Sequence, residues 1–188
     1  MPQPCRRASR VLVTAVAVLS LAPTPVAAQA ESSADFVPVT DAMLQDPDPN
    51  DWLNWRRTLD GWGYSPLDQI TPDNVAGLIP VWTFSTGVLG GHEGQPLVVN
   101  NTMYVVTPYP NVLYAFDLTE EGYPLHWKYR PDVNPFALGI ACCDAVNRGP
   151  AYADGKVVYN LLDGHTVAVD AITGREVWKT KIAELSIG

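Results

Sequence analysis

The sequence contains little cysteine and no long apolar segment, and these two shortages exclude several kinds of protein. Only three cysteines occur in 188 residues, too few for a small scaffold held together by several disulfides. The longest apolar run, from Val11 to Leu21, has eleven residues, whereas a helix that crosses a bilayer needs about 20. The three histidines are scattered, and this segment contains no Cys-x-x-Cys-His sequence that would attach a haem.

Positive charge is also scarce. The chain has 12 Lys and Arg residues against 20 Asp and Glu residues, which gives a formal net charge of −8. Proteins that bind nucleic acid present a positively charged surface, so this balance argues against a nucleic-acid partner. A strong negative charge suits a soluble protein, including one with a cationic partner.

The N-terminal segment, residues 1–28, has the pattern of a secretory signal peptide. Arg6, Arg7 and Arg10 precede the apolar run, and small residues around Ala28 offer a cleavage site. We therefore expect export to the periplasm and removal of the peptide; an uncleaved anchor or a disordered tail is the alternative. Cleavage would remove three arginines and no acidic residue, which changes the balance to 9 minus 20, or −11.

Two cysteines remain after export, because Cys5 lies within the signal peptide. They are adjacent, as Cys142 and Cys143 in the sequence GIACCDAVNRG. Disulfides persist in oxidising compartments, so the leading interpretation is a disulfide between these neighbours. Such a ring strains the peptide that it encloses, and strain of this kind is concentrated at functional sites. Two buried free thiols are an alternative; zinc is less favoured, because no second Cys or His pair stands at ligand spacing.

The remaining chain of about 160 residues is long enough for one hydrophobic core. Residues 29–50 are polar and rich in proline and aspartate, and they predict an extended leader. Helix signals are sparse: ITPDNVAGL predicts one or two turns, with Thr71 as the N-cap and Gly77 near the end. Short β-branched and aromatic runs separated by Asn-Asn and Asp-Gly turns instead predict an all-β fold. The expected strands are 96–99, 102–107, 112–117, 151–153, 156–160, 166–170 and 176–182.

A repeated pattern groups these strands into units. The sequence AVDAITGREVW (168–178) has a looser upstream counterpart, AFDLTEEGYPLHW (115–127). Trp82, Trp127 and Trp178 are separated by 45 and 51 residues. A period of about 40–50 residues with several strands in each unit is typical of β-propeller blades. In such a repeat, Asp and Gly shape the last hairpin turn and the tryptophan fills the gap between blades; a β-sandwich with coincidental tryptophans is the alternative.

This repeat resembles the tryptophan-docking repeat of the pyrroloquinoline quinone (PQQ) dehydrogenases. Three segments resemble the methanol/ethanol dehydrogenase family in the right order: 51–78, 81–99 (VWTFSTGVLGGHEGQPLVV) and 141–152 (ACCDAVNRGPAY). The resemblance runs from about Asp51 to the end. It implies that residues 51–188 form the incomplete N-terminal part of an eight-bladed propeller, since residues 81–188 would cover about two and a half blades.

The resemblance also implies roles for four residues. Cys142 and Cys143 would form a vicinal disulfide ring against one face of PQQ. Glu93 matches a family residue that hydrogen-bonds the edge of the cofactor. Arg148 matches an arginine beside the cofactor, and a guanidinium suits carboxylates and quinone oxygens. Without the resemblance, Glu93 and Arg148 would be interpreted as ordinary surface charges.

The implied reaction is the oxidation of a primary alcohol to an aldehyde, with Ca²⁺ or a lanthanide ion as a Lewis acid and a cytochrome c as electron acceptor. A homodimer of the full-length enzyme is a further expectation. The metal ligands and the catalytic base would lie beyond Gly188, so we expect this chain to contain neither and to be inactive alone. The alternative function is a non-catalytic periplasmic propeller scaffold with PQQ-like repeats.

Overall fold

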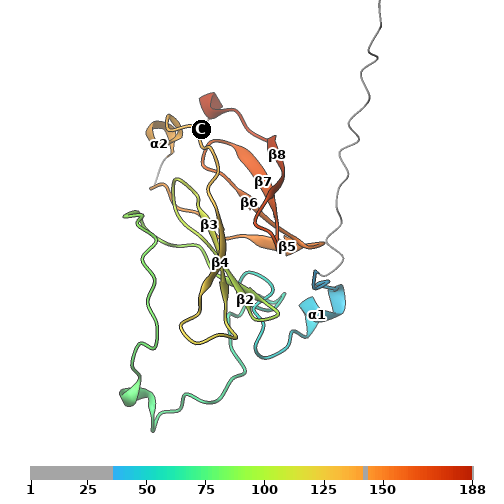
Figure 1. The fold of residues 1–188 in the computed structure, drawn as a ribbon, viewed down its shortest axis with the longest axis vertical. Coiled ribbons are helices and arrows are strands. Elements are labelled where there is room, and N and C mark those ends of the chain that lie inside the picture. Colours follow the sequence, from blue (N-terminus) through green and yellow to red (C-terminus); the bar gives the residue numbers. More distant parts are fainter. Residues whose placement is uncertain (1–35, 142–143, 188) are drawn as a thin grey trace, which may run out of the picture. The chain divides into compact units, whose positions relative to one another are not determined.

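The computed structural model describes residues 36–141 and 144–187, which belong to one compact unit, Ser33–Gly188 (Figure 1). The predicted signal peptide, the first part of the predicted leader and the two adjacent cysteines lie outside the described residues. None of the helices within the described ranges has the length and apolar character of a membrane span.

Eight strands form two four-stranded antiparallel sheets, each connected in simple up-and-down order. The first sheet contains β1 (Leu97–Val99), β2 (Thr102–Val106), β3 (Leu113–Asp117) and β4 (Leu125–Tyr129). The second contains β5 (Ala151–Ala153), β6 (Lys156–Asn160), β7 (His165–Asp170) and β8 (Glu176–Lys181). In Figure 1 the first sheet runs from green to yellow and the second is orange to red. The predicted all-β class is confirmed.

All seven predicted strands are present, with ends that differ by no more than one residue. The strand that sequence reasoning missed is β4, whose sequence LHWKY alternates exposed and half-buried side chains without a fully buried one. An outer strand of this kind carries polar residues on its solvent face, so its apolar pattern is weak.

Left-handed backbone at two hairpin turns explains their sequences. Asn100 and Asn101 have φ values of 46° and 61°, and Asp154 and Gly155 have φ values of 48° and 68°. Two successive residues with positive φ produce the turn whose twist matches that of the flanking strands, and Asn, Asp and Gly tolerate it best. The turns that were predicted at these positions are therefore confirmed.

The helices differ from expectation. Where one or two turns with Thr71 as N-cap were predicted, the structure forms a single 3₁₀ turn, η1 (Val75–Gly77). Asn74 accepts a hydrogen bond from Thr71 N (2.8 Å), so the Asn74 side chain closes the preceding turn instead. Three short helices were not predicted: α1 (Asp41–Gln45), α2 (Ala137–Ile140) and η2 (Leu185–Ile187).

The predicted leader is not uniformly extended in its described part. Helix α1 is capped by Thr40, whose hydroxyl accepts from Met43 N (3.3 Å). The segment before it packs on the second sheet, where the hydroxyl of Tyr152 donates to Val37 O (3.1 Å). A Cβ on Gly155 would lie 2.6 Å from the Phe36 ring, so the glycine of the β5–β6 turn makes room for that ring.

One hydrophobic core joins the two sheets. Leu97 and Leu113 of the first sheet and Val157, Val167 and Val169 of the second are all at most 1% exposed and belong to the same cluster. Burying a side chain of this size contributes about 1.5–3 kcal/mol relative to leaving it exposed. The apolar face of each sheet is therefore kept from water by the other sheet.

The repeat has the same geometry in both sheets. In the first, Ala115 pairs with Trp127 across β3 and β4; in the second, Ala168 pairs with Trp178 across β7 and β8. Each ladder shifts register directly after its alanine. The shared bulge shows that the two sheets are copies of one unit, as the sequence repeat predicted.

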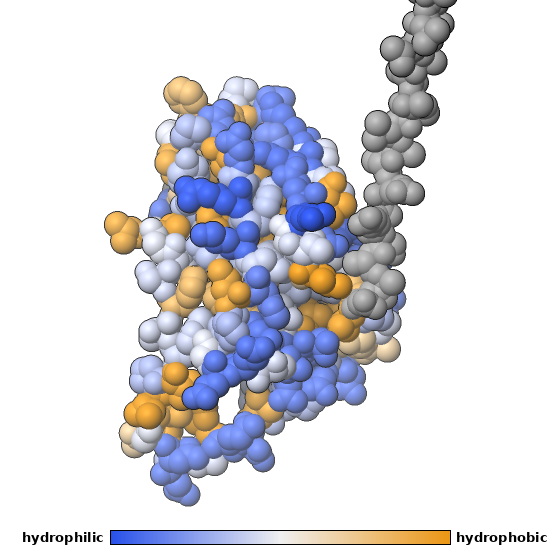
Figure 2. All heavy atoms as spheres, viewed as in Figure 1, coloured by the Kyte–Doolittle hydropathy of each residue, from blue (hydrophilic) through white to orange (hydrophobic). Residues whose placement is uncertain are grey.

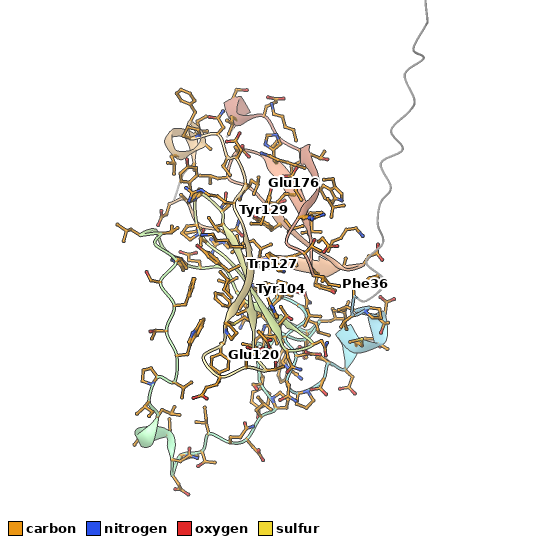
Figure 3. All side chains as sticks on the ribbon, in the orientation of Figure 1. Phe36, Tyr104, Glu120, Trp127, Tyr129 and Glu176 are labelled. Carbon is orange, nitrogen blue, oxygen red and sulfur yellow. The ribbon has the colours of Figure 1, made fainter. Side chains whose placement is uncertain are left out.

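Two of the three repeat tryptophans, Trp82 and Trp127, pack on the sheet that follows them in the sequence. Trp127 of β4 donates its indole N–H to Ala171 O (3.2 Å), beyond the end of β7, and Figure 3 shows its ring between the two sheets. Trp82 makes the equivalent contact with the first sheet, edge-on to Phe116 and Tyr123 at centroid distances of 5.2 and 5.8 Å. Trp178, at the same position of the second sheet, is 40% exposed. Tryptophans that bridge successive sheets are the arrangement expected of propeller blades.

Polar contacts reinforce this interface. The hydroxyl of Tyr129 donates to the carboxylate of Glu176, and Figure 3 shows the two residues together between β4 and β8. Burial, together with the neighbouring Glu176 carboxylate, raises the pKa of Tyr129. The hydroxyl of Tyr159 donates to Asn111 O (2.9 Å), and Asn111 Oδ1 accepts from Leu162 N (2.9 Å). The two bonds of Asn111 hold the loop after β2 against the turn after β6.

The stretch between Asp60 and Pro96 contains no strand, and η1 is its only regular element. Several of its large apolar side chains are exposed, including Trp62 (76%), Ile79 (77%) and Val81 (81%). Figure 2 shows apolar residues at the surface where this loop runs, at the lower left of the view.

Candidate functional site

Glu93 and Arg148 form an ion pair although they are 55 residues apart in the sequence. Arg148 Nη1 lies 2.6 Å from Glu93 Oε2. Glu93 stands four residues before β1 and Arg148 three residues before β5, so each leads into the first strand of its sheet. The structure therefore brings together the two residues that the sequence singled out. They lie on the segments that lead into β1 (residues 93–96) and into β5 (residues 147–150), called the entering segments below.

The pair is open to solvent. The side chain of Glu93 is 50% exposed and that of Arg148 is 78% exposed. A guanidinium carries five N–H donors, and the contact with Glu93 uses a terminal nitrogen on one side of the fork. Most of the side chain is exposed, so its remaining donors are accessible to a further carboxylate or another oxygen acceptor.

Main-chain packing beneath the pair requires glycine at two positions. A Cβ on Gly94 would lie 3.0 Å from Asn147 O and 3.2 Å from Val106 O. A Cβ on Gly149, whose φ is +103°, would lie 2.6 Å from Gln95 O. The close contact between the two entering segments therefore accounts for both glycines.

Asn147 is a residue of this region that sequence reasoning missed. It is only 8% exposed. Its Nδ2 donates to Asn160 O (2.8 Å) at the end of β6, and its Oδ1 accepts from Gly149 N (2.9 Å). The second bond closes an Asx turn, for which Asn-x-Gly is the sequence signal.

The loop before Glu93 is closed by His92. One ring nitrogen lies 3.1 Å from Thr86 Oγ1 and the other lies 3.0 Å from Gly90 O. His92 is exposed, and both of its ring contacts are to residues of its own loop. Gly91, next to it, would place a Cβ 3.3 Å from Asp144 Oδ2, so this loop faces the residue that follows the two cysteines.

The residues that flank the cysteine pair are anchored to both sheets. On the N-terminal side, Asn134 N donates to Asp163 Oδ2 (2.9 Å), shortly before α2. On the C-terminal side, Tyr109 N donates to Ala145 O (2.9 Å). Cys142 and Cys143 themselves, and the predicted disulfide between them, lie outside the described residues.

Asp163 is a buried carboxylate in the β6–β7 turn, 3% exposed. Its Oδ1 lies 2.9 Å from Nδ1 of His165. Burial raises the pKa of Asp163, but the hydrogen bonds from Asn134 and His165 and the charges of His165 and Lys179 outweigh it, so the pKa lies below its ordinary value. The carboxylate is therefore ionised at neutral pH and stabilises the turn beside α2.

The same part of the fold contains a mainly apolar cavity of about 430 Å³. It is lined by residues of α2, of the β6–β7 turn and of the segment that leads to η2, among them Ala137, Leu161, Leu162 and Leu185. Within the described ranges, no group of three His, Cys, Asp or Glu side chains could hold a metal ion. Metal ligands were expected beyond this chain, and that expectation is untested.

The chain matches the family model described as glucose/ethanol/alcohol dehydrogenase, beta-propeller domain, over residues 52–180. It is 48% identical over 157 residues to a lanthanide-dependent methanol dehydrogenase of Methylacidiphilum fumariolicum, covering 83% of this chain and 26% of that protein. It is 43% identical over 182 residues to methanol dehydrogenase (cytochrome c) subunit 1 of Methylobacterium organophilum, covering 94% and 28%.

A solved structure agrees with this match. The chain is similar to a europium-containing methanol dehydrogenase, with a TM-score of 0.73 and 48% identity over 76% of this chain and 25% of that one. The chain thus spans about a quarter of the length of the relatives that it matches. The blade repeat, the paired entering segments and these matches agree: the chain belongs to the PQQ β-propeller family of glucose, ethanol and alcohol dehydrogenases.

Proposed function

We propose that this chain is the N-terminal part of an exported, periplasmic PQQ-dependent alcohol dehydrogenase that oxidises a primary alcohol to an aldehyde. The observation that carries the proposal is the exposed Glu93–Arg148 pair, with a 2.6 Å contact between two segments that enter successive blades. Similarity to methanol dehydrogenases over most of the chain supports the reaction class.

The chemistry of the pair fits a flat polyanion. PQQ is a tricarboxylate with quinone oxygens, and a guanidinium binds such groups through charge-assisted hydrogen bonds. Arg148 is exposed and keeps donors beyond those that face Glu93. In this proposal Arg148 binds an oxygen of the cofactor, and Glu93 orients the guanidinium and accepts a hydrogen bond at the edge of the ring system.

Two further parts of the proposal concern residues outside the described ranges. The proposed Cys142–Cys143 disulfide offers one face of the cofactor an uncharged platform, next to Asp144. When bound, PQQ supplies the acceptor for the hydride that leaves the alcohol. Ca²⁺ or a lanthanide ion would act as Lewis acid, with ligands and a catalytic base supplied by the part of the protein that follows this chain.

The partners are proposed on the same basis. A cytochrome c would accept the electrons, as the name of one methanol dehydrogenase relative indicates for that protein. The net charge of −11 that this segment would have after removal of the signal peptide would favour a cationic acceptor. A homodimer of the full-length enzyme, and inactivity of the 188-residue chain alone, complete the proposal.

A cofactor titration tests this function. The complete cofactor-free protein is titrated with PQQ and Ca²⁺, or with PQQ and La³⁺, and binding is followed by PQQ absorbance. Alcohol oxidation is measured by reduction of a dye. The parent is compared with Arg148→Ala, Cys142→Ala and the 188-residue chain; Arg130→Ala, which changes another exposed arginine, is the matched control.

Weakened binding by Arg148→Ala and Cys142→Ala, with normal binding by Arg130→Ala, is the expected result. If Arg148→Ala and Cys142→Ala bind PQQ and oxidise alcohol like the parent, the assigned site is wrong. A parent that does not bind PQQ would favour the alternative function, a non-catalytic periplasmic scaffold. Dye reduction by the 188-residue chain with ethanol and PQQ would contradict its proposed inactivity.

A further inference from the structure

We propose that Asn147 is a positioning residue: it fixes the main chain of Arg148, and thereby sets where the guanidinium meets Glu93. Its side chain anchors the entering segment of the second blade to the end of β6 through Asn160 O (2.8 Å). The inferred effect on the cofactor rests on the proposed function, whereas the effect on the main chain does not.

The need for an anchor follows from the exposure of the pair. Surface ion pairs contribute little to stability, and two long exposed side chains do not hold each other in one geometry. Arg148 is 78% exposed, and its described side-chain contact is the one with Glu93. A binding group on such a side chain is preorganised mainly through its backbone, since supporting contacts around a site decide how precisely it is held.

Asn147 provides that support through two side-chain hydrogen bonds, one to β6 and one to the residue after Arg148. Its Nδ2 donates to Asn160 O and its Oδ1 accepts from Gly149 N (2.9 Å), so the two bonds bracket the arginine. The side chain is buried, where an unpaired amide is unfavourable, and both bonds are therefore maintained.

The same residue connects to the segment that carries Glu93. A Cβ on Gly94 would lie 3.0 Å from Asn147 O, and Gln95 N donates to Arg148 O (3.4 Å). Because the two entering segments touch through their main chains, a shift of residues 147–149 would be transmitted to residues 93–95. The distance between the carboxylate and the guanidinium thus depends on a side chain that contacts neither of them.

The first experiment needs no cofactor. Amide hydrogen exchange is measured in the complete cofactor-free protein for Gly149 and Gln95. We expect Asn147→Ala to speed exchange at Gly149 at least tenfold and to speed it measurably at Gln95. Asn147→Asp keeps an acceptor for Gly149 N but loses the donor to Asn160 O, so a smaller increase at Gly149 is expected.

Asn160→Ala is the matched control. It removes a side chain whose Oδ1 accepts from Thr166 Oγ1 (2.8 Å), but it leaves the main-chain carbonyl to which Asn147 donates. Exchange at Gly149 should remain as in the parent. Unchanged exchange at Gly149 in both Asn147 variants would overturn the inference, and so would equal acceleration by Asn160→Ala.

The second experiment asks whether Asn147 acts through Arg148. PQQ titration of the complete protein should show about tenfold weaker binding for Asn147→Ala. The double variant with Arg148→Ala should bind no more weakly than Arg148→Ala alone, because the guanidinium that Asn147 positions is then absent. Fully additive losses would overturn the inference. If the parent itself does not bind PQQ, the proposed function fails and the exchange experiment alone decides the role of Asn147.

Discussion

The indole of Trp127 lies so close to Gly174 that a Cβ on the glycine would stand 2.6 Å from Cδ2 of the ring. Gly174 also has a φ of +70°, a conformation that side chains rarely adopt. The glycine of the repeat therefore serves two purposes. It allows the left-handed backbone of the turn between β7 and β8, and it leaves space for the tryptophan ring of the preceding blade. This contact joins the two sheets at their outer strands.

Gly174→Ala should lower the free energy of unfolding by about 1–3 kcal/mol, because the added methyl group overpacks the ring and strains the turn. Gly139→Ala is the control, since a Cβ there would meet nothing within 4 Å and Gly139 lies in α2. Urea unfolding followed by tryptophan fluorescence measures both. Equal stability of the two variants would contradict the proposed role of this contact.

Arg148→Ala should separate stability from binding. The ion pair is half or more exposed, so its loss should change the free energy of unfolding by no more than about 1 kcal/mol. A hydrogen bond to a charged group contributes about 1.5–3 kcal/mol, so PQQ binding should weaken roughly ten- to a hundredfold. Thermal unfolding and PQQ titration of the same samples check both parts; a large loss of stability would indicate a structural role instead.

Asp163 should contribute stability that depends on pH. Its pKa in the folded protein lies below the ordinary value, so the contribution is present above about pH 4 and is lost as the pH falls through the folded pKa. Asp163→Asn should cost about 1–3 kcal/mol at pH 7, and the difference from the parent should shrink in acid. Urea unfolding between pH 7 and pH 3 tests this, with the exposed Asp73→Asn as control. A difference that is independent of pH would refute it.

The cysteine pair remains a prediction from the sequence. Exported protein should contain a disulfide between Cys142 and Cys143, because the two cysteines are adjacent and disulfides persist in oxidising compartments. Intact mass and alkylation of non-reduced, denatured periplasmic protein test this. Two alkylatable thiols would show that the disulfide does not form.

The 188-residue chain by itself should fold poorly or self-associate. Strand β8 is the last strand of its sheet among the described residues, and Val177 and Trp178 on it and Ile182 just after it are 48%, 40% and 63% exposed. Exposed apolar strand edges promote association. Analytical ultracentrifugation should detect oligomers that diminish when Val177 and Ile182 are replaced by lysine. A monomer with a sharp, reversible melt would contradict this prediction.

The sequence by itself determined the strands and their turns. Alternating β-branched and aromatic residues placed β5 and β6 at their observed bounds, and Asn-Asn and Asp-Gly fixed the hairpins, because these signals depend on neighbouring residues only. The spacing of the tryptophans indicated blades for a similar reason, since each repeat carries its own turn and its own docking residue. Glu93 and Arg148 were found only through resemblance to a family, because an exposed charge has no local signal that distinguishes a ligand contact.

Only the tertiary structure decided how these parts meet. It brought Glu93 and Arg148 together across 55 residues, and it placed Asn147 under Arg148 through a carbonyl of β6. It also showed that β4, whose sequence has a weak apolar pattern, is a strand because β3 offers it an unpaired edge. The physical reason is the same in each case: hydrogen bonds and packing between distant segments depend on the positions of both partners, and a linear sequence specifies those positions only after the sheets have formed.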